Sequence, residues 1–207
     1  MTATPGQLTH CIAELFGVSA RSIAPIDRAL VDAGLRRVGG RGSSAIKVNT
    51  DDAVSSLIAV AVQGTIRTAP DRVRTYGDLP RCVIDLDRKN PIPPMPNFMA
   101  LPEQHSFREA LSAIIQDYAQ SEHARPRHWQ DMLASVKFSA PWPSAVIEFH
   151  GEDAQATFVY MCIEPDDDRG YDAGIDGEGR QADLTAEYRF TSDTLIAVAD
   201  LIGGGVS

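Results

Sequence analysis

The chain has 207 residues, of which 43% are hydrophobic, and it carries a formal net charge of −9 at pH 7. This apolar content excludes a generally disordered chain, and no apolar run is long enough to predict a transmembrane helix or a secretory signal. Three widely separated cysteines, Cys11, Cys82 and Cys162, predict neither a disulfide framework nor a zinc cluster. We therefore expect a cytoplasmic, reduced protein that holds no metal or cofactor.

Two short helices are predicted at the beginning of the chain. Apolar residues at helical spacing over residues 7–16 predict the first helix, and Gly17 is expected to end it. Ser19 is a suitable N-cap for a second helix over residues 20–33, which carries one apolar stripe and ends before Gly34. The two helices are therefore expected to lie close together, joined by a tight turn.

The next stretch, GLRRVGGRGSSAIKV at residues 34–48, concentrates positive charge in an acidic chain. Residues 1–50 carry six Lys and Arg against three Asp and Glu, whereas the remainder carries 13 Lys and Arg against 25 Asp and Glu. Leu35–Val38 and Ala45–Val48 are predicted to form two short strands joined by a glycine-rich tip. This asymmetry predicts one end that faces a polyanion and an acidic body that faces solvent.

The middle of the chain begins with an apolar helix predicted over residues 51–62, with Thr50 as its N-cap. Residues 66–105 contain one short predicted helix, around PDRVRTYGDL. Five prolines between positions 91 and 102 exclude regular helix or sheet there and indicate a stiff, extended connector. We place a domain boundary in this connector.

The last part of the chain, residues 106–207, predicts helices and consecutive strands. Ser106 and Glu109 have the spacing of a capping box, and the helix they begin continues to about Glu122. This order of elements predicts an α+β fold with an antiparallel sheet. The further predicted elements are a shorter helix around Trp129 to Leu133, strands at 135–139, 144–150, 156–163 and 183–191, and a final helix capped by Ser192 or Asp193.

Residues 13–23, AELFGVSARSI, resemble the helix-turn-helix pattern. Ala13 allows a close approach of the helices, Gly17 takes the turn, Val18 is expected to fill the space between the helices, and Ser19 caps the second helix. Followed by a basic hairpin, the pattern resembles a winged helix-turn-helix domain of transcriptional regulators. It is also similar to small helix-turn-helix proteins of bacterial prophages and related mobile elements. The resemblance covers about the first 62 residues.

The resemblance implies a set of DNA contacts on the second helix and the hairpin. Arg21 is the best candidate for a base edge, because a guanidinium group can bond guanine O6 and N7 together. Arg41 at the hairpin tip is expected to enter a minor groove. Pro25 departs from the pattern, because proline kinks a helix or forces it to begin nearer Ala24. The expected contacts are Arg21, Ser22, Arg28, Arg36, Arg37, Arg41, Ser43, Ser44 and Lys47.

We therefore expect three units: a winged helix-turn-helix domain at 1–65, a connector at 66–105, and an α+β domain at 106–207 for dimerisation or partner binding. The expected function is a sequence-specific transcriptional regulator, not an enzyme, that binds double-stranded DNA as a homodimer. Two alternatives stay open. One is a replication, packaging or recombination accessory factor of a mobile element, and the other is a ligand sensor or enzyme within residues 106–207.

Overall fold

A computed structural model describes residues 3–38, 47–82, 95–119, 133–150, 155–162 and 186–203. It has the α+β fold with an antiparallel sheet that the order of predicted elements indicates. The elements in chain order are α1 (Pro5–Leu15), α2 (Ala20–Asp32), α3 (Thr50–Ala61), the 3-10 turn η2 (Ile66–Thr68), α4 (Ala69–Gly77), β1 (Arg81–Cys82), α5 (Pro96–Met99), α6 (Phe107–Ala119), β2 (Leu133–Ala140), β3 (Ser144–His150), β4 (Gln155–Met161), β5 (Ala186–Thr191) and α7 (Ser192–Gly203).

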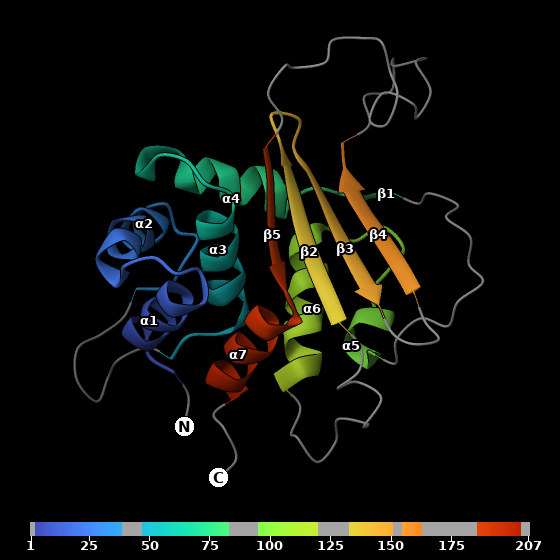
Figure 1. Cartoon of the computed structure of the whole chain (residues 1–207), viewed down its shortest axis with the longest axis horizontal. Helices are drawn as coiled ribbons and strands as arrows, with labels where there is room; N and C mark the ends of the chain where they lie inside the picture. Colours follow the sequence, from blue (N-terminus) through green and yellow to red (C-terminus); the bar gives the residue numbers. More distant parts are fainter. Residues whose placement is uncertain are drawn as a thin grey trace.

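The sheet has five strands in the order β1-β4-β3-β2-β5, and every neighbouring pair is antiparallel (Figure 1). β2, β3 and β4 follow one another as a meander, and β5 returns to pair with β2. These four strands overlap the strands predicted at 135–139, 144–150, 156–163 and 183–191. The short strand β1 is not predicted, because two residues carry no periodic signal.

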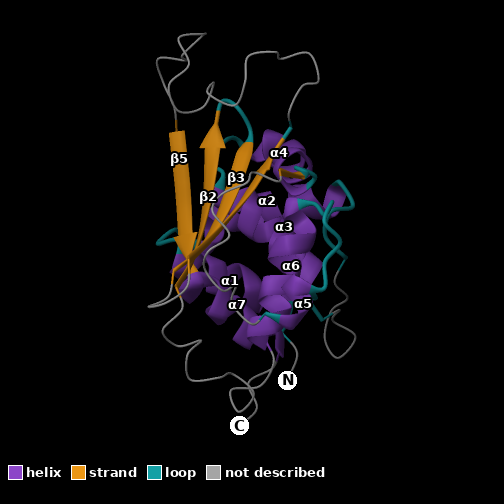
Figure 2. Cartoon of the chain, turned by 90° about the vertical axis from the view of Figure 1, so that its right-hand side faces the viewer, coloured by secondary structure: helices purple, strands orange, loops and turns teal. Residues whose placement is uncertain are grey.

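One face of the sheet is covered by the helices, and Figure 2 shows them gathered on that side. The alternation in β3 explains the two faces: Ala145, Ile147 and Phe149 are buried, whereas the residues between them are partly exposed. Since successive side chains of a strand point to opposite faces, the apolar set turns toward the helices. The result is a two-layer structure with its core between sheet and helices.

Helix α6 crosses the middle of the covered face. Its predicted capping box is confirmed: the Ser106 amide donates to Glu109 Oε2 over 2.7 Å, and the Glu109 amide donates to Ser106 Oγ over 3.3 Å. α6 packs against α3, α4, α5 and α7, so it joins the early helices to the last one. Residues 120–132, where the shorter helix around Trp129 is predicted, lie outside the described residues.

The first third of the chain shares its core with the sheet. α1 packs against α7, α3 packs against α6 and β5, and the buried residues from Ala3 to Ala199 form one continuous cluster. The predicted division into units 1–65 and 106–207 therefore does not separate two cores. Of the predicted connector, residues 66–82 and 95–105 are packed on this body, where the Arg81 amide donates to the His105 carbonyl over 2.9 Å. The prediction of no regular helix between 91 and 102 is wrong for Pro96–Met99, which form α5 with a proline at the first position, where a helix needs no N–H. Residues 83–94 lie outside the described ranges.

Helix ends near the beginning of the chain follow the local signals in the sequence. Gly17 and Gly34 have φ of 62° and 70°, the left-handed conformation that glycine adopts without steric cost. After each glycine the next amide donates back across the last turn, Val18 to Ala13 and Leu35 to Leu30, each over 2.9 Å. This is the Schellman arrangement, which satisfies the last carbonyls of a helix. At the start of α3, Asn49 is the N-cap and not Thr50, which is the first helical residue.

Candidate nucleic-acid interface

α2 presents two unpaired cations on one exposed face. Arg21 and Arg28 are both exposed, and within the described ranges neither makes an ion pair or a side-chain hydrogen bond. They are seven residues apart, which in an α-helix is almost two full turns and about 10 Å along the axis. Their side chains therefore project in nearly the same direction, as the prediction of a groove-facing set requires.

The packing of the opposite side of α2 decides which face stays outside. Ile23 and Leu30 are buried, and α2 packs against α1, α3, α4 and η2 (Figure 1). Ser19 is the N-cap, and its Oγ accepts from the Ser22 amide over 3.2 Å, so the prediction of this cap is confirmed. Ser22 is exposed beside Arg21 at the start of the helix, with its hydroxyl 2.7 Å from that of Ser19.

Two details of the predicted helix pair are wrong or incomplete. Val18 is 43% exposed, so it does not fill the space between α1 and α2, although Ala13 is buried where a close approach is predicted. Pro25 lies inside α2, and the helix is continuous from Ala20 to Asp32, so it does not begin nearer Ala24. Because proline has no N–H, the Arg21 carbonyl loses its partner four residues along the helix.

The predicted phosphate contact of Arg36 is wrong. Its side chain is only 2% exposed, and its Nη1 forms a hydrogen-bonded ion pair with Asp27 of α2. Burial raises the pKa of Asp27, and this effect outweighs the opposing charge and hydrogen bond of Arg36. A guanidinium group in this position cannot reach DNA while the protein is folded, so Arg36 joins the segment after α2 to the body of the protein.

Arg37 is also engaged by a carboxylate of the protein. Its Nε and Nη2 donate to Asp52 Oδ2 over 3.1 and 2.9 Å, and Nη2 also donates to the Lys47 carbonyl over 2.7 Å. Burial acts to raise the pKa of Asp52, but hydrogen bonds from the Arg37 and Asn49 amides and from the Arg37 side chain leave that pKa below its usual value. These bonds compete with the predicted phosphate contact of Arg37, which stays a prediction because the side chain is still about half exposed.

The first predicted wing strand is absent. Leu35–Val38 form no strand, because the chain turns at Gly34 and the Leu35 amide is used to close α2. Val48 is buried, and its amide donates to the Ala3 carbonyl over 3.0 Å, so it pairs with the residues before α1. The rest of the predicted wing, including Arg41, Ser43 and Ser44, lies outside the described residues. Lys47 is described and exposed, and its ammonium has no partner among the described side chains.

Arg67 is a cation that the sequence analysis missed. It lies in η2, which packs against α2, and it is exposed and makes no ion pair within the described part of the chain. The run of Thr65, Thr68 and Pro70 is a signal for a turn leading into a helix, which could have located η2. Its position beside α2 depends on tertiary packing and has no local signal.

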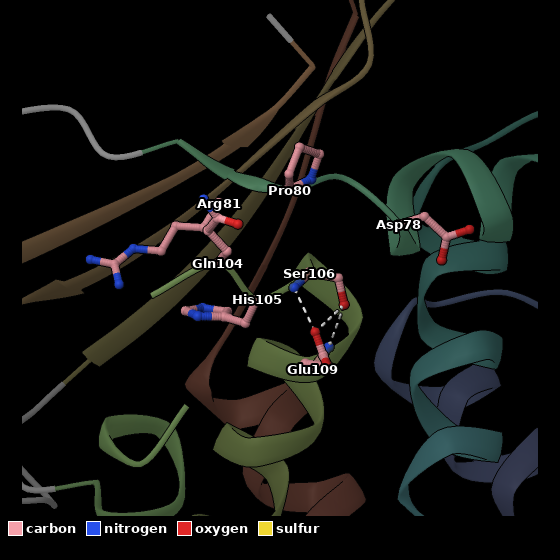
Figure 3. A pocket seen from close by; sticks show the side chains of 7 residues that line it. All are labelled: Asp78, Pro80, Arg81, Gln104, His105, Ser106 and Glu109. Atoms are coloured by element: carbon pink, nitrogen blue, oxygen red, sulfur yellow. Dashed lines mark hydrogen bonds between the residues drawn. The ribbon is translucent and has the colours of Figure 1, made fainter. Parts of the chain in front are cut away.

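A hollow lies at the start of α6, and it bears on the alternative of a ligand site or enzyme (Figure 3). It has a volume of about 460 Å³ and is lined in part by Asp78, Arg81 and His105. His105 Nδ1 lies 2.7 Å from the Pro102 carbonyl and Nε2 lies 2.9 Å from the Tyr160 hydroxyl. Since a carbonyl only accepts, Nδ1 carries the proton and Nε2 accepts from Tyr160. Both ring nitrogens are therefore occupied within the protein.

No protein-family model, curated protein or solved structure matches the chain. None of the helices within the described ranges has the length and apolar character that a membrane crossing requires. The same ranges hold no group of three or more His, Cys, Asp and Glu placed to bind a metal ion. The candidate site is the exposed face of α2, which carries Arg21 and Arg28 without ion pairs in the described structure.

Proposed function

We propose that the protein is a sequence-specific regulator of transcription that binds double-stranded DNA with the exposed face of α2. The observation that carries this proposal is the pair Arg21 and Arg28, unpaired within the described residues and aligned on the exposed side of α2. Arg36 and Arg37 are left out of the proposed contact surface, because their guanidinium groups bond Asp27 and Asp52. Lys47 and Arg67 are added to it as phosphate contacts.

The spacing of the two arginines suits a helix lying in the major groove. About 10 Å along the helix corresponds to about three base-pair steps of B-form DNA. Arg28 is proposed to bond guanine O6 and N7, and Arg21, nearer the helix start, to contact a base or its phosphate. Ser22 can donate a hydrogen bond to a phosphate beside Arg21.

Asp32 limits how the duplex lies against α2. It is exposed one turn beyond Arg28 and repels phosphate, so the amino-terminal part of the helix is the part that approaches DNA. The net charge of −9 acts in the same direction, because the acidic body repels DNA from its other surfaces. The contact is thus proposed to be small, and a homodimer that reads two half-sites is proposed to supply the remaining affinity.

Fluorescence anisotropy against a duplex selected from a random library tests the proposal. Arg28→Ala should weaken binding to the selected duplex by about tenfold or more, and should affect random DNA less. Arg189→Ala is the matched control, because Arg189 is an exposed cation on β5, away from α2. Equal affinities of the Arg21→Ala, Arg28→Ala and Arg189→Ala variants would exclude α2 as the contact surface.

Mapping of DNA crosslinked to the protein in cells separates the proposed regulator from the mobile-element alternative. Enrichment at promoters supports regulation of transcription. Enrichment at an origin, a packaging site or a recombination site would instead assign the same surface to replication, packaging or recombination. Light scattering of the purified protein, with and without the selected duplex, measures whether it binds as a homodimer.

A further inference from the structure

Asp52 is a buried carboxylate that organises the chain around the start of α3. It is 3% exposed, and its two oxygens accept from the Arg37 amide, Arg37 Nε, Arg37 Nη2 and the Asn49 amide, all at 2.9 to 3.1 Å. Arg37 Nη2 donates in addition to the Lys47 carbonyl over 2.7 Å. One carboxylate and one guanidinium therefore hold positions 37, 47 and 49 together.

The arrangement fixes the backbone on both sides of residues 39–46. The Arg37 amide donates to Asp52, and the Lys47 carbonyl accepts from Arg37 Nη2, so both positions are held at the start of α3. Arg36, the neighbour of Arg37, is at the same time paired with Asp27, which directly precedes Arg28 in α2. Arg36 and Arg37, which follow one another after α2, thus bond to α2 and to α3 respectively.

We propose that Arg37 is a positioning residue for DNA binding, which acts by holding Lys47 against the start of α3 so that its ammonium meets a phosphate of the duplex bound by α2. This inference rests on the proposed function. According to this inference, Asp52 favours DNA binding although its own charge is negative, because it holds Arg37 in place. It also explains why Arg37 is only half exposed, at 48% of its side chain, although it lies in the most basic stretch of the sequence.

The chemistry requires arginine at position 37. The planar guanidinium group presents donors in fixed directions, so that Nε and Nη2 reach one carboxylate oxygen while Nη2 also reaches the Lys47 carbonyl. A lysine keeps the positive charge but has a single nitrogen on a flexible chain, and it cannot make this set of bonds. The substitution Arg37→Lys therefore separates the charge of the residue from its geometry.

The salt dependence of DNA affinity provides the test, measured for the folded full-length chain with the selected duplex. Lys47→Gln should lower the slope of log affinity against log salt by about one unit, as the loss of one phosphate contact does. Arg37→Lys should lower the slope by a similar amount although no charge is lost, and adding Lys47→Gln should lower it no further. An Arg37→Lys variant with the slope and affinity of the wild type would show that Arg37 is not a positioning residue. Arg189→Lys, on β5, is the control.

The substitution Asp52→Asn tests the proposal through the direction in which DNA affinity changes. Loss of a negative charge near DNA should strengthen binding if only the charge of the site counts, whereas loss of the positioning bonds should weaken it. Binding is measured at a temperature at which circular dichroism shows that the variant is folded. Weaker binding than the wild type supports the proposal, and equal or tighter binding overturns it.

Hydrogen exchange of the free protein distinguishes this inference from the function on which it rests. The Arg37 and Asn49 amides should exchange faster in Asp52→Asn than in the wild type, since both donate to Asp52. If the exchange result holds but the wild-type protein binds no duplex, the proposed function fails while the structural role of Asp52 stands. If the wild type binds DNA and the Arg37→Lys and Asp52→Asn variants bind equally well, only the positioning role fails.

Discussion

Phe16, at the end of α1, meets Phe190 of β5 edge to face, with ring centroids 6.1 Å apart and planes at 75°. The contact joins the turn between α1 and α2 to the edge of the sheet, across more than 170 residues of sequence. Phe190 also lies against Phe138 of β2, with ring centroids 5.8 Å apart. The turn that precedes α2, the proposed DNA-binding helix, therefore packs against the sheet, and α2 shares one hydrophobic core with it.

This relationship predicts that the helices and the sheet unfold together. Phe190→Ala should destabilise the whole chain by about 3 kcal/mol, because it removes a buried aromatic side chain from the shared core. Urea unfolding followed by circular dichroism and by intrinsic tryptophan fluorescence should give coincident transitions for the wild type and the variant. Met99→Ala, at an exposed position, is the control. Two separate transitions would contradict a single cooperative unit.

Because Arg36 is paired with Asp27, its substitution should destabilise the protein, whereas substitution of Arg28 should not. Arg36→Met should cost about 3 kcal/mol, because it leaves Asp27 without its partner in a largely buried site. Arg28→Ala should stay within about 0.5 kcal/mol of the wild type, since Arg28 is exposed and unpaired in the described structure. Urea titration measures both.

A double substitution gives the sharper result for the same pair. Arg36 Nε and Nη2 are buried without a hydrogen-bond partner among the described residues, so burial of this guanidinium group is only partly compensated. Asp27→Leu combined with Arg36→Met should recover most of the loss, because apolar groups of similar size need no compensation. A double variant no more stable than Arg36→Met would indicate that the pair is strongly favourable.

His105 predicts a decrease in stability at mildly acidic pH. Burial lowers the pKa of its imidazole, and this effect outweighs the hydrogen bond to the Pro102 carbonyl, which acts to raise it. The unfolded chain therefore binds a proton more readily, so stability is fully present above the unfolded-state pKa of about 6.5 and is lost as the pH falls from there through the folded-state pKa.

The measurement is the free energy of unfolding at pH 7.5 and at pH 5.5. The wild type should lose stability over this interval, by about 1.4 kcal/mol for each pKa unit that separates the two states. His105→Gln should be less stable at pH 7.5 but should show a smaller pH dependence. His10→Gln, which removes an exposed imidazole from α1, is the control. An unchanged pH dependence in His105→Gln would contradict the prediction.

Pro25 predicts a substitution that stabilises the protein. It lies on the exposed side of α2, so a replacement disturbs no core contact, and alanine restores the N–H that can donate to the Arg21 carbonyl. Pro25→Ala should raise the free energy of unfolding by about 1–3 kcal/mol. Pro5→Ala is the matched control, because Pro5 occupies the first position of α1, where a helix needs no N–H. A destabilised Pro25→Ala variant would show that proline suits this site.

Local signals in the sequence were sufficient for much of the fold. Gly17 and Gly34 end their helices, Ser19 and the pair Ser106 and Glu109 cap the helices that follow, and short apolar stretches locate β2 to β5. These features depend on a few neighbouring residues, since a helix end needs a left-handed residue and a strand at the core boundary needs every second side chain to be apolar. They were therefore predictable without knowledge of the rest of the chain.

Tertiary structure alone decided which cations are available for binding. Arg28, Arg36 and Arg37 look alike in the sequence, yet Arg36 meets a carboxylate nine positions away and Arg37 one that is 15 positions away, whereas Arg28 stays free in the described structure. The pairing depends on where the turn after α2 places each guanidinium group relative to Asp27 and Asp52. The sequence alone does not show which carboxylate an arginine will pair with, because Coulomb attraction depends on distance in space and not on distance along the chain.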